Sequence, residues 1–199
     1  GLPGVKHRLV FLIYKKHMGG MRMAKKRKCG VLLPISSLPS KYGIGCFSKE
    51  AYQFIDRLKA AGQSYWQILP LGPTGYGDSP YQSVSTFAGN PYFISLDELI
   101  EEGVLTRAEC EKVNWGKAKG SIDYEKIYNG RYPLLRKAYE RSKISENPEY
   151  QKFVNENSWG LSDYALFMAV KGRFDNVEWT KWAEDIRLRW KWAMDYYRE

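Results

Sequence analysis

The chain has 199 residues, of which 44% are hydrophobic and 27% charged, a balance that excludes an intrinsically disordered protein and is typical of a globular one. Its net charge of +9 is concentrated at one end, because residues 1–30 carry nine Lys or Arg and no acidic residue. Residues 31–199 hold the other 22 basic residues and all 22 acidic ones. Their formal charge is therefore zero, which argues against nucleic-acid binding by the folded part.

Residues 1–28 are predicted to be a basic, disordered leader. The apolar run at residues 9–14 is six residues long and is followed by two lysines, whereas the core of a signal peptide needs about seven apolar residues. No stretch of the sequence approaches the roughly 20 apolar residues of a membrane span, so we expect no membrane partner.

Cysteine and histidine are too sparse for a metal site or a nucleophilic triad. The cysteines Cys29, Cys46 and Cys110 form no CxxC pair, and the only histidines, His7 and His17, lie in the basic segment. We therefore expect no zinc site and no Ser-His-Asp triad in the body of the protein. An odd, small number of cysteines is typical of free thiols in a reducing compartment, so we expect a cytoplasmic protein.

A parallel strand–helix–strand unit is predicted to follow the leader. Residues 31–38 (VLLPISSL) and 65–71 (YWQILPL) are predicted to be buried strands. Between them, Ser48 is a good helix N-cap and Gly62 a good stop. The apolar positions of this predicted helix recur at helical spacing: Ala51, Phe54, Ile55, Leu58 and Ala61. The second strand is a nearly continuous apolar run, which implies cover on both faces of a parallel sheet, as in a barrel or a doubly wound sheet.

The second half of the chain is predicted to be helical. Residues 72–90 are polar and rich in Gly, Ser and Tyr, which predicts a long loop. Ser95 with Glu98, and Thr106 with Glu109, match capping boxes that start short helices. Further helices are predicted at about 131–142, 148–157, 159–171 and from Asp185 to the C-terminus. The last has no stop signal and two strands leave open sheet edges, so we expect part of a larger fold.

The loop after the second predicted strand carries residues suited to hydroxyl-rich ligands. Its segment GDSPY places Asp78, Ser79 and Tyr81 where α/β barrels build their active sites, and tyrosine rings stack on sugar faces. The alternative is that Asp78 and Ser79 cap the loop while Tyr81 packs into the core. Spacing alone favours this second interpretation.

Three blocks of the sequence resemble a known family. Residues 30–45 (GVLLPISSLPSKYGIG), residues 65–92 (YWQILPLGPTGYGDSPYQSVSTFAGNPY) and residues 159–172 (WGLSDYALFMAVKG) are similar, in order, to blocks of the amylomaltases. These are 4-alpha-glucanotransferases, or disproportionating enzymes, of glycoside hydrolase family 77. The resemblance runs from about Cys29 to the C-terminus.

The resemblance implies an α/β fold: the N-terminal portion of a (β/α)8 TIM barrel of the alpha-amylase type, with a mostly helical insertion after the second strand. After the leader, residues 29–92 would form the first two β/α units with the substrate loop. Residues 93–199 would form a helical insertion subdomain that is truncated at its C-terminus.

The implied activity is transfer of alpha-1,4-glucan segments between maltooligosaccharide or starch chains, or to glucose as acceptor, by a retaining mechanism without cofactor or metal. The family's nucleophile and acid/base lie in later barrel strands, hence beyond Glu199. The 199-residue chain alone is therefore expected to be inactive. A stand-alone glucan-binding module is the alternative, and a nucleic-acid binder acting through the basic tail is disfavoured by the neutral body.

Four residues match the family's substrate-binding positions. Tyr81 matches the tyrosine of the SPY motif, which is expected to stack on the glucose beside the cleaved bond, and Ser79 lines the same cleft. Tyr76 and Tyr128 match two tyrosines of an accessory groove for long glucan chains. For Asp78 the resemblance implies only that it shapes the loop.

Overall fold

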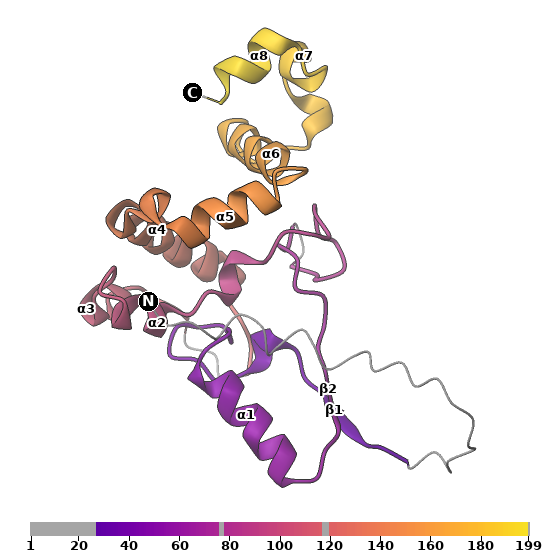
Figure 1. The fold of residues 1–199 in the computed structure, drawn as a ribbon, viewed down its shortest axis with the longest axis vertical. Helices are drawn as coiled ribbons and strands as arrows, with labels where there is room; N and C mark the ends of the chain where they lie inside the picture. The colour runs from indigo at the N-terminus through magenta and orange to yellow at the C-terminus, as the bar shows by residue number, and fades with distance from the viewer. Residues whose placement is uncertain (1–26, 76–77, 117–119, 199) are drawn as a thin grey trace.

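The computed structural model describes residues 27–75, 78–116 and 120–198 (Figure 1). The basic segment expected to be disordered thus lies almost wholly outside the described residues. The described part forms two strands, β1 (Gly30–Leu32) and β2 (Tyr65–Gln67), and the following helices: α1 (Lys49–Ala60), α2 (Leu96–Glu101), α3 (Arg107–Glu111), α4 (Tyr124–Ser142), α5 (Pro148–Glu156), α6 (Leu161–Arg173), α7 (Glu184–Arg187) and α8 (Lys191–Tyr196). Short 3-10 helices lie at Ile35–Ser37, Pro91–Phe93, Ile144–Glu146 and Trp179–Lys181.

The predicted parallel strand–helix–strand unit is confirmed. β1 and β2 pair in parallel with Val31 opposite Trp66, and α1 is the crossover between them. The helix begins after Ser48 as predicted, although the Ser48 hydroxyl donates to the Glu50 carboxylate instead of accepting an N–H. The Phe54 ring of α1 contacts the Trp66 ring of β2 edge to face at 4.9 Å. The apolar face of α1 therefore packs on the strands.

The prediction that both strands are buried is wrong for the described residues. Leu32 is 57% exposed and Tyr65 is 55% exposed, and the strands span three residues each instead of seven or eight. Side chains alternate across a strand, so Leu32 and Tyr65 share the face opposite Val31 and Trp66. α1 covers only the Trp66 face, and this leaves the other face open.

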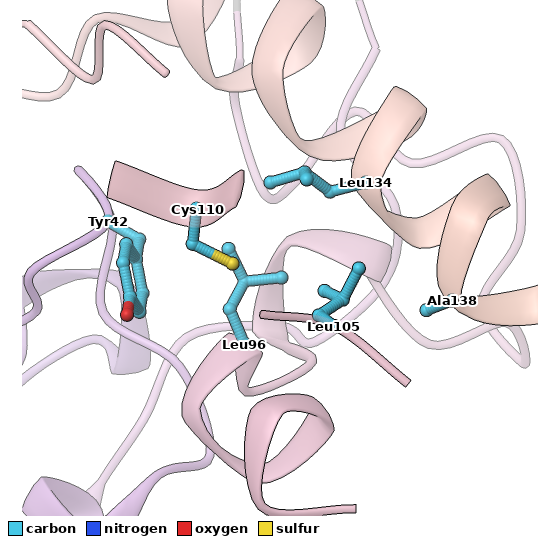
Figure 2. Packing of buried hydrophobic residues seen from close by; sticks show 6 residues of the cluster. All are labelled: Tyr42, Leu96, Leu105, Cys110, Leu134 and Ala138. Atoms are coloured by element: carbon cyan, nitrogen blue, oxygen red, sulfur yellow. The ribbon is translucent and has the colours of Figure 1, made fainter. Parts of the chain in front are cut away.

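A hydrophobic core joins the loop after β1 to the first helices of the second half (Figure 2). Leu96 of α2 and Cys110 of α3 point towards each other, with Leu134 of α4 close by. The remaining buried members are Tyr42, Leu105 and Ala138. This core fastens α4 over the loop that leaves β1.

The caps of α2 and α3 follow the sequence prediction closely. The Thr106 capping box is confirmed, since the Thr106 hydroxyl accepts from the Glu109 N–H and the Glu109 carboxylate accepts from the Thr106 N–H. At α2 only the first half forms, with Ser95 Oγ accepting from the Glu98 N–H at 3.2 Å. Both helices start where the sequence indicated.

α4 begins earlier than predicted. The periodicity indicated a start near residue 131, but Asp123 caps the helix by accepting from the Lys126 N–H at 3.2 Å. Pro133 therefore lies inside the helix. Its missing N–H leaves the Asn129 carbonyl without a helical partner, and water can satisfy this carbonyl because Asn129 is exposed.

The C-terminal helices form a second core. The single helix predicted from Asp185 is wrong, because Arg189 adopts a left-handed conformation with a φ of 59° and separates α7 from α8. The turn brings Ala193 and Met194 against Leu166 and Val170 of α6. Burial of these side chains therefore outweighs the continuation of one helix. In Figure 1 this unit lies at the end of the molecule away from the strands.

Candidate functional site

The loop after β2 lies at the carboxyl ends of both strands. Parallel strands end at the same edge of a sheet, so the segments leaving β1 and β2 meet there. The loop leaves at Leu71 and returns at Asn90, whose N–H donates to the Leu71 carbonyl at 2.9 Å. The Asn90 side chain then accepts from the Tyr92 N–H at 2.9 Å and starts the next turn. The first of these bonds closes the base of the loop.

A cavity of about 150 Å³ lies beneath this loop. Its apolar walls come from the segments that follow both strands: Pro34, Ile35, Ile44, Leu69, Pro70, Leu71 and Phe93. Its polar groups come from Ser36, Thr74, Asp78, Asn90 and Tyr124. Apolar walls with a few convergent polar groups are the usual composition of a small-molecule site.

Asp78 occupies an unusual position in the cavity wall. Its backbone is left-handed, with a φ of 54°, a conformation that Asp tolerates better than most residues. Burial raises the pKa of its carboxyl group. Burial also raises the pKa of Tyr124 and Tyr92, and the nearby Asp78 charge adds to both shifts. Both phenols therefore stay protonated and remain hydrogen-bond donors.

Ser79 and Tyr81 have different roles in the loop. Ser79 Oγ accepts from the Tyr81 N–H at 3.3 Å and so shapes the turn. The Tyr81 side chain is 72% exposed, which contradicts the alternative that it packs into the core. Its ring is available to stack on a ligand. Tyr76, the third loop residue predicted to bind substrate, lies outside the described residues.

Tyr128 lies on α4 in a row of tyrosine rings. Its ring centroid is 4.9 Å from that of Tyr132, which lies 6.0 Å from Tyr92, and Tyr92 lies 6.3 Å from Tyr124 in the cavity wall. Tyr128 itself is exposed, and its hydroxyl accepts from the Asn176 side chain at 3.4 Å. The row thus connects Tyr128 to the cavity, while Tyr81 stands apart on the loop.

Tyr124 and Tyr132 were missed by the sequence reasoning. Tyrosines at positions 124, 128 and 132 recur every four residues, which places them on one side of a helix. This signal could have found them if α4 had been predicted to start at residue 124.

Arg131 fixes α4 against the segment that leaves the loop. Its side chain is fully buried, and Nη1 donates to the Ile94 carbonyl at 2.7 Å. Burial lowers the pKa of this guanidinium, and its Nε and Nη2 have no partner within residues 27–75, 78–116 and 120–198. The hydrogen bond thus joins α4, which carries Tyr128 and Tyr132, to the segment that follows the loop.

In the described segments, no three His, Cys, Asp or Glu side chains gather as a metal-binding group. None of the helices described is both long and apolar enough to cross a bilayer.

The fold and the site define an α/β protein with a tyrosine-bearing loop at the carboxyl ends of its parallel strands, the edge at which α/β enzymes bind their ligands. The chain belongs to the 4-alpha-glucanotransferase family, whose model matches residues 33–199. It is 50% identical over 177 residues to the 4-alpha-glucanotransferase of Streptococcus pneumoniae serotype 4, with 88% of this chain and 35% of that protein covered.

More distant relatives show the same partial coverage. The 4-alpha-glucanotransferase of Thermus thermophilus is 44% identical over 84% of this chain and 33% of its own length. A solved amylomaltase from Streptococcus agalactiae, in complex with acarbose, superposes with a TM-score of 0.80 at 37% identity, covering 87% of this chain and 36% of that one. The chain thus spans about a third of the length of the relatives it matches.

Proposed function

We propose that the protein to which this chain belongs is a 4-alpha-glucanotransferase that moves alpha-1,4-glucan segments between maltooligosaccharide or starch chains, with glucose as one acceptor. The observation that carries this proposal is the exposed Tyr81 on a loop closed at the strand ends, within a sequence of this family. An exposed aromatic ring on a loop with a closed base is suited to stacking on a pyranose face.

For the fold, we propose the N-terminal portion of a (β/α)8 barrel of the alpha-amylase type. In it, residues 29–92 supply the first two β/α units and residues 93–199 a helical insertion, preceded by a basic leader at 1–28. The parallel pairing of β1 and β2 and the open apolar face at Leu32 and Tyr65 support this proposal. In a barrel, that face is covered by the remaining elements.

Within this proposal the described residues bind and orient the glucan. Tyr81 stacks on the glucose next to the cleaved bond, and Ser79 holds the turn that presents it. Tyr76 and Tyr128 contact longer chains in an accessory groove. We assign the nucleophile and the acid/base to sequence beyond Glu199, because no segment of this chain resembles the family's catalytic motifs. Retaining transfer needs a pair of carboxyl groups about 5–5.5 Å apart. No cofactor, nucleic acid or membrane takes part, and the location is cytoplasmic.

Two measurements test the function. Incubation of the whole protein with maltotriose is expected to yield products both longer and shorter than maltotriose, whereas hydrolysis alone would yield only shorter ones. The 199-residue chain alone is expected to bind maltoheptaose without transferring it. A robust transfer rate from this chain alone would contradict the placement of the carboxylates beyond Glu199.

Tyr81→Ala tests the site directly. Removing a stacking ring is expected to weaken maltoheptaose binding about tenfold in calorimetry. Tyr139→Ala is the matched control, because Tyr139 is 58% exposed on α4, remote from the loop in sequence. Equal affinities of the two variants would exclude Tyr81 from the site.

A further inference from the structure

Two exposed aromatic side chains from distant segments meet beside the loop. Phe87 is 79% exposed and Trp159 is 66% exposed, and their ring centroids are 4.8 Å apart with the ring planes at 87°. Phe87 lies in the loop that carries Tyr81, and Trp159 lies between α5 and α6. Figure 1 shows this loop reaching the start of α6. Contiguous exposed apolar patches mark binding sites more often than single exposed side chains do, so two touching exposed rings are a candidate site.

The Phe87 backbone is held in place on the loop. The Ser85 hydroxyl accepts from the Phe87 N–H at 3.2 Å and from the Ala88 N–H at 3.1 Å. The Ser83 hydroxyl donates to the Ser85 carbonyl at 2.6 Å. This network lets Phe87 project into solvent from a fixed position.

The Trp159 backbone is held by the turn that joins α5 to α6. The Asn157 carbonyl accepts from the N–H groups of Gly160 at 3.2 Å and Leu161 at 2.9 Å. The Asn157 side chain donates to the Phe153 carbonyl at 2.8 Å. The indole is therefore presented from a closed turn, and a ring that is already oriented loses little conformational entropy when it binds a ligand.

The geometry of the pair suits a flat ligand. In an edge-to-face pair, one ring meets the other with its edge, so at least one broad face remains free. Six residues separate Phe87 from Tyr81, so their backbones lie within roughly 20 Å of each other on a loop whose base is closed. A chain of sugar rings stacked on Tyr81 can extend to the pair.

We propose that Phe87 and Trp159 form an aromatic platform that binds an alpha-1,4-glucan segment extending from the Tyr81 loop. This inference rests on the proposed function and adds a binding position to it. We expect the platform to discriminate by length, because a longer glucan spans more of the surface between Tyr81 and the pair than a short one does.

The competing explanation is structural, with the pair acting only as a latch between the loop and the helices. A latch would hold the loop in place for every ligand. Its removal would therefore lower the affinity for short and long oligosaccharides equally. A platform contributes affinity only to chains long enough to reach it. Chain-length dependence therefore separates the two explanations.

The experiment compares maltotriose with maltoheptaose by calorimetry on the 199-residue chain and its variants. Trp159→Ala and Phe87→Ala are each expected to weaken maltoheptaose binding about tenfold and maltotriose binding less than twofold. Trp159→Phe keeps an aromatic ring and is expected to retain maltoheptaose affinity within about threefold. Trp192→Ala is the matched control, because Trp192 is 59% exposed and also contacts a second ring, that of Trp190.

Each outcome either supports or overturns the aromatic platform. Parallel losses for both oligosaccharides would make the pair a latch, and unchanged maltoheptaose affinity in Trp159→Ala and Phe87→Ala would also overturn the platform. Equal loss in Trp192→Ala would show a general effect of removing surface rings. Failure of the unmodified chain to bind either oligosaccharide would refute the binding function itself. Thermal unfolding of each variant checks that the fold is retained.

Discussion

At the scale of single residues, the loop after β2 depends on backbone conformations that few side chains accept. Asp78 has a positive φ, and a β-branched residue there would be strained. Its carboxyl group is also partly buried in the cavity wall, where charge is unfavourable because the surroundings solvate it poorly. The conformation and the ionisation of Asp78 thus act on the same turn that presents Tyr81.

Asp78→Asn separates these two effects, since Asn accepts the left-handed conformation but carries no charge. The folded-state pKa of Asp78 is raised, so its contribution to stability is fully present below the unfolded pKa of about 3.9 and is lost as the pH rises through the folded value. The unfolding free energy of the wild type relative to Asp78→Asn should therefore decrease from pH 3 towards pH 7. Urea unfolding across this range checks it, and a difference that grows with pH would contradict it.

At the scale of elements, ion pairs and caps join the short helices to α4. Glu109 of α3 accepts from Lys137 and Arg141 of α4 and also completes the Thr106 capping box. These hydrogen bonds to Arg141, Lys137 and the Thr106 N–H hold the pKa of Glu109 well below its usual range. One carboxylate therefore stabilises the start of α3 and its position on α4.

Removal of the Glu109 carboxylate should change how thermal stability depends on pH. Because the folded pKa of Glu109 is lowered, its stabilisation is fully present above the unfolded pKa of about 4.3 and is lost progressively as the pH falls from there through the folded pKa. Glu109→Gln should therefore have a lower thermal midpoint than the wild type at pH 7 and approach it at acidic pH. Thermal scans at both pH values check this expectation. Thr106→Ala should cost about 1 kcal/mol at pH 7, because the N-cap of α3 is lost.

Elements with strong local signals could be predicted from the sequence. α1 has a stop at Gly62 and an apolar stripe, and the Thr106 box is a local hydrogen-bond pattern; both formed as predicted. The break at Arg189 could not be predicted, because only contacts with α6 favour it. Exposure of the strands depends on which elements cover them, and local propensity does not contain this information.

The candidate site was predictable only in part for the same reason. Spacing alone left Tyr81 between core and surface, and its exposure decides that question. The Phe87–Trp159 contact joins positions 72 residues apart in sequence, so no short pattern indicated it. The buried Arg131 was missed because its burial depends on Ile94 and on the packing of α4.

At the scale of the whole molecule, the described residues contain separate cores. One core joins α2, α3 and α4 around Leu96, and another joins α6, α7 and α8 around Leu166. The two cores share no buried residue. Contacts such as the hydrogen bond between Tyr128 and Asn176 join the two regions. Regions with separate cores open with different free energies.

Leu166→Ala tests this independence. Creating a cavity in the α6–α8 core is expected to cost about 2–4 kcal/mol there. Amide exchange should accelerate in α6, α7 and α8 while α2 and α4 keep their protection, and Leu96→Ala should produce the reverse pattern. Mass-spectrometric hydrogen exchange measures both variants. Uniform acceleration along the chain in either variant would indicate one cooperative unit.

The hydrogen bond from the Asn90 N–H to the Leu71 carbonyl has an evolutionary consequence. It sets the spacing of the loop's two stems independently of the residues between them. Insertions, deletions and substitutions between the stems can then change what is displayed without disturbing the strand pairing below. Ligand preference can therefore change during evolution while the strands and the loop stems stay the same. A loop transferred from a relative onto the same stems should confer that relative's ligand preference.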